Sequence, residues 1–136
     1  MKEPRVLATR ERMRVLVYSD NAATRGQVLT GLGSRPHPGL PEVEYVEAAT
    51  HAAAIALVHT GNIGLAILDG EATPAGGMAI AKQVRNEVDE CPPIIVLIGR
   101  SEDGWLARWA QADAVVVHPL DAIRLAEALA ALVLSA

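Results

Sequence analysis

Aromatic residues are scarce in this sequence: it has two tryptophans, two tyrosines and no phenylalanine among 136 residues. Hydrophobic residues still make up 51% of the chain, so the interior must be built from valine, leucine, isoleucine and alanine. A chain of this length forms one domain and buries enough surface to fold without crosslinks. The single cysteine, Cys91, excludes an internal disulfide bond and a cysteine-based metal site, and it suits a reducing cytoplasm.

Excess positive charge and long apolar runs are also missing. The net charge is −4 at pH 7, which argues against nucleic-acid binding, because that function needs a basic face. The first 12 residues alternate in charge and contain no apolar core, so they do not form a signal peptide. No segment reaches the roughly 18 uncharged apolar residues that a membrane span needs. We therefore expect a soluble, cytoplasmic protein.

Short apolar segments alternate with helical patterns along the chain. Five strands are predicted, at residues 14–18, 43–48, 64–69, 93–98 and 114–118. Five helices are predicted, at residues 22–32, 52–59, 78–88, 104–110 and 121–134. This alternation predicts an α/β fold in which a parallel sheet has helices on both faces. The strand at 43–48 alternates apolar and polar residues, unlike the other four, and is therefore expected at an edge of the sheet.

Polar residues follow three of these strands, at the carboxyl ends where open α/β sheets place their sites. Ser19 and Asp20 follow the first strand. Asp69 ends the third strand, with Glu71 two residues later, and His118 ends the fifth. The strand ends therefore predict a polar site.

The segments around these residues resemble the receiver domain of bacterial response regulators. RVLVYSDNAATR resembles the family's first strand and acidic loop, and LAILDGEATPAGGM its phosphoacceptor segment. PPIIVLIGR and ADAVVVHP resemble its fourth and fifth strands. The likeness covers residues 13–136 and leaves 1–12 as an N-terminal extension. It implies a flavodoxin-like (βα)5 fold, a doubly wound parallel sheet of strand order 2-1-3-4-5, and a cis bond between His118 and Pro119.

The resemblance also implies roles for individual residues. Asp69 takes the place of the phosphoacceptor, and Asp20 that of a direct Mg²⁺ ligand. The backbone carbonyl of Glu71 takes the place of another ligand. Mg²⁺ offsets the repulsion between a carboxylate and an incoming phosphoryl group. Ser19 replaces the family's second acid; its hydroxyl can hold a water molecule but brings no charge, so Mg²⁺ binding is expected to be weak or absent.

Three further positions depart from the family. Ile98 stands where a threonine or serine would bind a phosphoryl oxygen, and it cannot donate a hydrogen bond. His118 replaces the lysine; a neutral histidine at a strand end and a weak substitute cation are both open interpretations. Val115 replaces the switch aromatic residue. These losses predict an atypical receiver in which phosphorylation, and above all a phosphorylation-driven switch, is doubtful.

Trp105 and Trp109 lie four residues apart and so share one face of the helix at 104–110. One interpretation is packing on the sheet, at least for one of them. The other is a partner-binding patch, because tryptophan is enriched at interface hot spots. In the family, this helix, the fifth strand and the last helix form the usual output and dimer surface. A homodimer through that surface is one expectation.

Three functions stay open at this point. The favoured one is a stand-alone atypical receiver, not an enzyme, that signals through protein partners, either a histidine kinase or an unidentified effector. The alternative is a working phosphoacceptor of a two-component phosphorelay, phosphorylated on Asp69 with Mg²⁺. The third is a flavodoxin-like enzyme or nucleotide binder; the chain has no GxGxxG motif, no P-loop and few aromatics for a flavin to stack on.

Overall fold

The computed structural model describes residues 12–72, 76–100 and 103–134, so the expected N-terminal extension lies outside the described residues apart from Arg12. The strands are β1 (Met13–Tyr18), β2 (Val43–Ala48), β3 (Leu65–Asp69), β4 (Ile94–Ile98) and β5 (Ala114–Val117). They form one parallel sheet in the order β2-β1-β3-β4-β5. This confirms the flavodoxin-like fold and its strand order.

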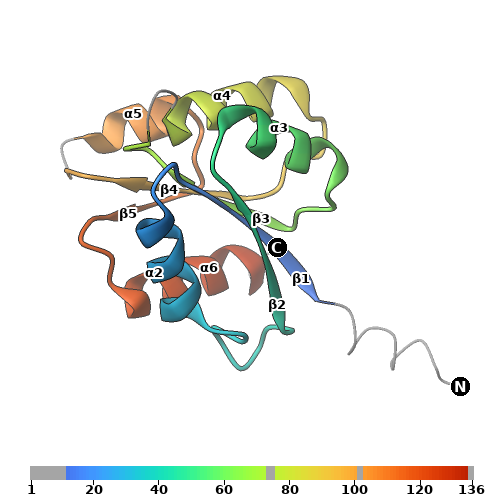
Figure 1. Cartoon of the computed structure of the whole chain (residues 1–136), viewed down its shortest axis with the longest axis vertical. Coiled ribbons are helices and arrows are strands. Elements are labelled where there is room, and N and C mark those ends of the chain that lie inside the picture. Colours follow the sequence, from blue (N-terminus) through green and yellow to red (C-terminus); the bar gives the residue numbers. More distant parts are fainter. Residues whose placement is uncertain (1–11, 73–75, 101–102, 135–136) are drawn as a thin grey trace, which may run out of the picture.

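Helices cover both faces of the sheet (Figure 1). They are α2 (Ala22–Leu32), α3 (His51–Thr60), α4 (Gly77–Glu87), α5 (Gly104–Trp109) and α6 (Ala122–Leu134). α2 and α6 lie on one face, and α3, α4 and α5 on the other (Figure 1). Each face of the sheet is covered by its own buried core, and both cores are aliphatic apart from the buried Tyr18. Within the described ranges, no helix is long and apolar enough to cross a membrane.

Burial explains which strands are central. Every residue of β3 and β4 is buried, as expected of apolar strands covered on both faces. β2 is buried at Val43 and Ala48 but exposes Glu44 and Glu47 between them. The predicted edge position of this strand is confirmed.

Polar side chains cap the first turns of the two helices next to the site by accepting hydrogen bonds from backbone N–H groups. The Asn21 carboxamide accepts from the backbone N–H of Ala23 at 2.8 Å and so begins α2. The Asp121 carboxylate accepts from the N–H of Ile123 at 2.9 Å at the start of α6. The two helices approach closely at Gly31, where an added Cβ would lie 3.0 Å from the Cβ of Ala122. A glycine is therefore needed there to let α2 reach α6.

The register of the strands brings the predicted site residues to one edge. Tyr18 of β1 pairs with Leu68 of β3, so the residue after each, Ser19 and Asp69, lie side by side. The ends of β4 and β5 come to the same edge, where the N–H of His118 donates to the carbonyl of Ile98 at 2.8 Å.

Candidate functional site

Asp69 lies at the carboxyl end of β3 and is 4% exposed. Both of its carboxylate oxygens accept hydrogen bonds from the protein. The backbone N–H of Glu71 donates to Oδ1 at 2.9 Å, and the hydroxyl of Ser19 donates to Oδ2 at 2.8 Å. Hydrogen bonds to an ionised group are stronger than neutral ones, so these donors hold the carboxylate firmly in place.

Ser19 is fully buried, with an exposure of 0%, in the loop between β1 and α2. Its Oγ accepts from the backbone N–H of Asn21 at 3.0 Å. Because a hydroxyl has one hydrogen, the Ser19 hydrogen points at Asp69. Arg25 of α2 anchors this loop. Its Nη1 donates to the carbonyl of Ser19 at 2.6 Å, and its Nε donates to the Glu47 carboxylate at 2.9 Å.

His118 approaches Asp69 from the end of β5. Its peptide bond to Pro119 is cis, which confirms the expectation drawn from the resemblance. Its Nε2 lies 3.8 Å from Oδ1 of Asp69. That distance is too long for a hydrogen bond and close enough for an ion pair if the imidazole is protonated. Both interpretations of His118 therefore stay open, and in either one the contact is loose.

The side chain of Ile98 is buried in the apolar core and takes no part in the polar site. It is 1% exposed and belongs to the aliphatic core beneath α3, α4 and α5. Val115 of β5 packs against the same core. The two positions that the family uses for a hydroxyl donor and a switch aromatic therefore contribute packing here.

A cavity of about 470 Å³ opens above Asp69. It is lined by Asp20, Asn21, Thr24, Asp69, Glu71, Gly99 and His118. Three of these residues are acidic, and His118 is the one that can carry a positive charge. The Glu71 carboxylate lies over Gly99, where an added Cβ would be 2.9 Å from its Oε1.

The pKa of the Tyr18 phenol responds to the negative charge at the end of β1. Burial raises the pKa of Tyr18 above its usual value, and the Asp20 and Asp69 carboxylates raise it further. An acidic environment of this kind opposes the approach of another anion.

The family resemblance implies Mg²⁺, but the described residues do not fit this ion as they stand. They contain no group of three or more histidine, cysteine, aspartate or glutamate side chains that could hold a metal ion. Of the two carboxylates at the end of β1 and β3, Asp20 is exposed and Asp69 is occupied by protein donors. The hydroxyl of Ser19 donates its hydrogen to Oδ2 of Asp69, so a cation at that oxygen would have to share it with the hydroxyl hydrogen.

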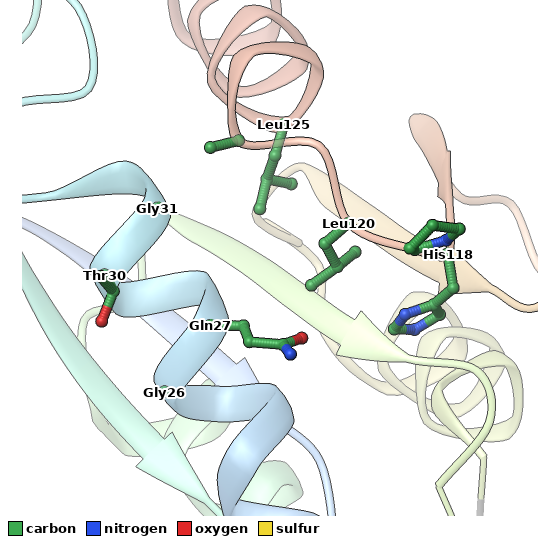
Figure 2. A pocket seen from close by; sticks show the side chains of 9 residues that line it. Gly26, Gln27, Thr30, Gly31, His118, Leu120 and Leu125 are labelled. Atoms are coloured by element: carbon green, nitrogen blue, oxygen red, sulfur yellow. The ribbon is translucent and has the colours of Figure 1, made fainter.

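A second cavity, of about 730 Å³, lies between α2 and the loop that leads into α6. Figure 2 shows Gln27 of α2 pointing across this cavity toward Leu120, with Leu125 also on the side opposite α2. His118 borders this cavity as well as the acidic one. Among the described residues, it is the one residue that lines both of these cavities.

Three large apolar side chains are exposed on α5, β5 and the start of α6. Trp105 of α5 is 60% exposed, Val117 of β5 38% and Ile123 of α6 71%. We call these three residues the α5–β5–α6 surface. Of the two tryptophans named as a partner-binding patch or as packing on the sheet, Trp105 is exposed and the side chain of Trp109 lies outside the described residues. A cavity of about 640 Å³ separates β5 from α6 beside this surface.

Sequence reasoning did not identify Arg25 as part of the site. An arginine in the first turns of a helix is usually exposed, and no local pattern shows that its side chain folds back to the preceding strand end. Sequence reasoning noted that the Ser19 hydroxyl can hold a water molecule but did not identify its bond to Asp69. The pairing of Ser19 with Asp69 depends on strand register, which short motifs do not specify.

The sequence and structure comparisons both find response regulators, whereas the scan of protein-family models finds no match. An uncharacterised response regulatory protein of Mycobacterium tuberculosis, found in two strains, is 57% identical over 111 residues, covering 82% of this chain and 84% of the relative. The solved chemotaxis protein CheY4 of Vibrio cholerae shares the fold, with a TM-score of 0.73 and 23% identity over 90% of this chain and 99% of that one.

A second solved structure is the response regulator protein TrrA of Thermotoga maritima, in complex with Mg²⁺-BeF. Its TM-score is 0.73 at 28% identity, covering 88% of this chain and 98% of that one. The parallel sheet of this strand order, with an aspartate buried at the end of β3, has the fold of the solved receiver proteins. The chain belongs to the response regulator receiver family, as its 57% identity to a response regulatory protein shows.

Proposed function

We propose that this chain is an atypical receiver domain that acts in signal transduction through protein contacts and without a phosphorylation-driven switch. One observation carries the proposal: the acceptor position Asp69 is kept, while Ile98 and His118 occupy the positions of the two groups that hold a phosphoryl group in the family. The proposal assigns the chain no enzymatic reaction and no requirement for bound Mg²⁺.

The electrostatics of the acidic cavity support this proposal. A phosphoryl group on Asp69 would lie among the carboxylates of Asp20 and Glu71, and like charges in a partly buried site repel. Transfer to a carboxylate needs preorganised donors or cations to offset that repulsion. Among the described residues that line the cavity, His118 has the one side chain that can become a cation, and its Nε2 lies 3.8 Å from Oδ1 of Asp69.

The α5–β5–α6 surface is the proposed site of protein contacts. It exposes Trp105, Val117 and Ile123 from three neighbouring elements. Single exposed apolar residues are common on protein surfaces, but Trp105 is 60% exposed and so leaves a large apolar side chain in contact with water. We propose that a second copy of the chain or a signalling partner, such as a histidine kinase, covers it.

Intact-mass spectrometry after incubation with Mg²⁺ and acetyl phosphate tests the proposal. We expect no phosphoryl adduct on the natural chain. The matched control is the triple variant Ser19→Asp/Ile98→Thr/His118→Lys, which restores the second acid and the two missing donors, and we expect it to acquire an adduct that Asp69→Asn removes. An adduct on the natural chain as abundant as on the triple variant would overturn the proposal and establish the alternative, a phosphorelay acceptor.

A further inference from the structure

We infer that Ser19 is a built-in cap on Asp69: its buried hydroxyl occupies the carboxylate oxygen that a metal ion would share, and so suppresses Mg²⁺ binding at this site. The inference rests on the proposed function in one respect, since it takes Asp69 as the family's acceptor position. The inference gives a second cause of weak Mg²⁺ binding, in addition to the negative charge that is lost when Ser19 replaces the family's second acid.

The cap is directional. Asn21 donates its backbone N–H to Oγ of Ser19 at 3.0 Å, which leaves the hydroxyl hydrogen for Oδ2 of Asp69 at 2.8 Å. An oxygen that accepts from Asn21 and donates to Asp69 turns no free hydrogen toward the cavity. The remaining oxygen, Oδ1, accepts from the N–H of Glu71 at 2.9 Å.

The cap is also held in position. Ser19 has an exposure of 0% and Asp69 of 4%, so solvent has little access to the bond between them. Arg25 anchors the carbonyl of Ser19 at 2.6 Å and ties the same loop to Glu47 of β2. Water competes poorly for a buried hydrogen bond to an ionised group, so the capped arrangement persists.

Replacing the cap by an acid reverses its effect. Mg²⁺ selects carboxylate oxygens, and its affinity rises with the number of charges offered. Ser19→Asp removes the donated hydrogen and adds a negative charge beside Asp69 and Asp20. Ser19→Asn is the matched control because it has the same shape as aspartate without the charge.

Magnesium chloride titration of the ¹⁵N-labelled full chain tests the inference, followed by the backbone amide signals of Asn21 and Glu71. These amides donate to Ser19 and Asp69, so they report the cap directly. We expect no saturable shift in the natural chain or in Ser19→Asn up to about 20 mM Mg²⁺, and saturable binding at least about tenfold tighter in Ser19→Asp. Saturable binding by the natural chain within about threefold of Ser19→Asp would overturn the inference.

A second measurement applies if Ser19→Asp does not fold. Ser19→Ala removes the donated hydrogen without adding a charge, so it also separates the cap from the missing charge: we expect saturable Mg²⁺ binding in Ser19→Ala where the natural chain shows none. The same response to Mg²⁺ in Ser19→Ala and the natural chain would refute the cap. The outcomes separate from those of the mass experiment: Mg²⁺ binding by a chain that is not phosphorylated refutes the cap alone, and phosphorylation without an intrinsic metal site refutes the proposed function alone.

Discussion

Arg25→Ala should loosen the loop that carries the cap on Asp69. The Arg25 side chain is 16% exposed and makes two contacts: Nη1 with the carbonyl of Ser19 at 2.6 Å and Nε with Glu47 at 2.9 Å. A hydrogen bond from a charged donor to a partly buried carbonyl contributes about 1.5–2 kcal/mol to the free energy of unfolding. The ion pair adds about 0.5 kcal/mol, because Glu47 is 45% exposed.

The expected loss is therefore about 2–2.5 kcal/mol in the free energy of unfolding. For a domain of this size it corresponds to a fall of about 7–9 °C in Tm. Thermal and urea unfolding followed by far-UV circular dichroism measure both quantities. Arg25→Lys should lose most of the same stability, since a single ammonium group cannot reach both partners in the way the guanidinium does.

Glu47→Gln serves as the control, because it removes the ion pair and leaves the bond to Ser19. It should cost no more than about 0.5 kcal/mol. If Arg25→Ala proved no more destabilising than Glu47→Gln, the anchoring of Ser19 by Arg25 would be refuted. The amide signal of Asn21 gives a local check, since it should shift in Arg25→Ala and stay in place in Glu47→Gln.

Two further predictions concern other parts of the molecule. Burial raises the pKa of Tyr45 from 10.0 to about 12, so the unfolded chain loses this proton at a lower pH than the folded one. The free energy of unfolding should therefore fall as the pH rises from 10 toward 12. Urea unfolding of the natural chain and of Tyr45→Phe should show the difference between their free energies of unfolding shrinking over that range. Trp105→Ala should change the free energy of unfolding by less than about 0.5 kcal/mol and weaken self-association at least about tenfold in sedimentation velocity, whereas Leu134→Ala, an exposed apolar control, should not; equal association in both variants would contradict the proposed surface.

The fold was accessible from the sequence because its signals are local. Each predicted helix and strand matches the structure to within one residue at either end. Runs such as Ile94–Ile98 contain only apolar β-formers, and Asn21 and Asp121 mark helix starts by their side-chain chemistry. The edge position of β2 followed from alternation of polarity alone.

The details of the site were less accessible because they depend on contacts between distant segments. The motif resemblance named Asp69, Asp20 and His118 as residues of one site, and in the structure all three line one cavity. The bond from Ser19 to Asp69 spans 50 residues of sequence, and the geometry of one rotamer decides whether the hydroxyl holds a water molecule or the carboxylate.

The histidines of α3 illustrate the same limit. His51 and His59 are far from any metal-ligand spacing in the sequence, and no function could be assigned to them. In the structure they bind Gln83 and Glu87 of α4, at 2.7 and 3.1 Å, and so join two helices on one face of the sheet. Contacts of this kind appear only when the helices are packed.

His118 is a wall common to all three cavities, since it lines the acidic one, the one beside α2 and the one between β5 and α6. Changing this side chain therefore reshapes three surfaces at once. A defect observed in a His118 variant cannot by itself be assigned to the chemistry of Asp69. Variants of residues that border a single cavity, such as Thr24 for the acidic one and Gln27 for the one beside α2, are needed to locate its origin.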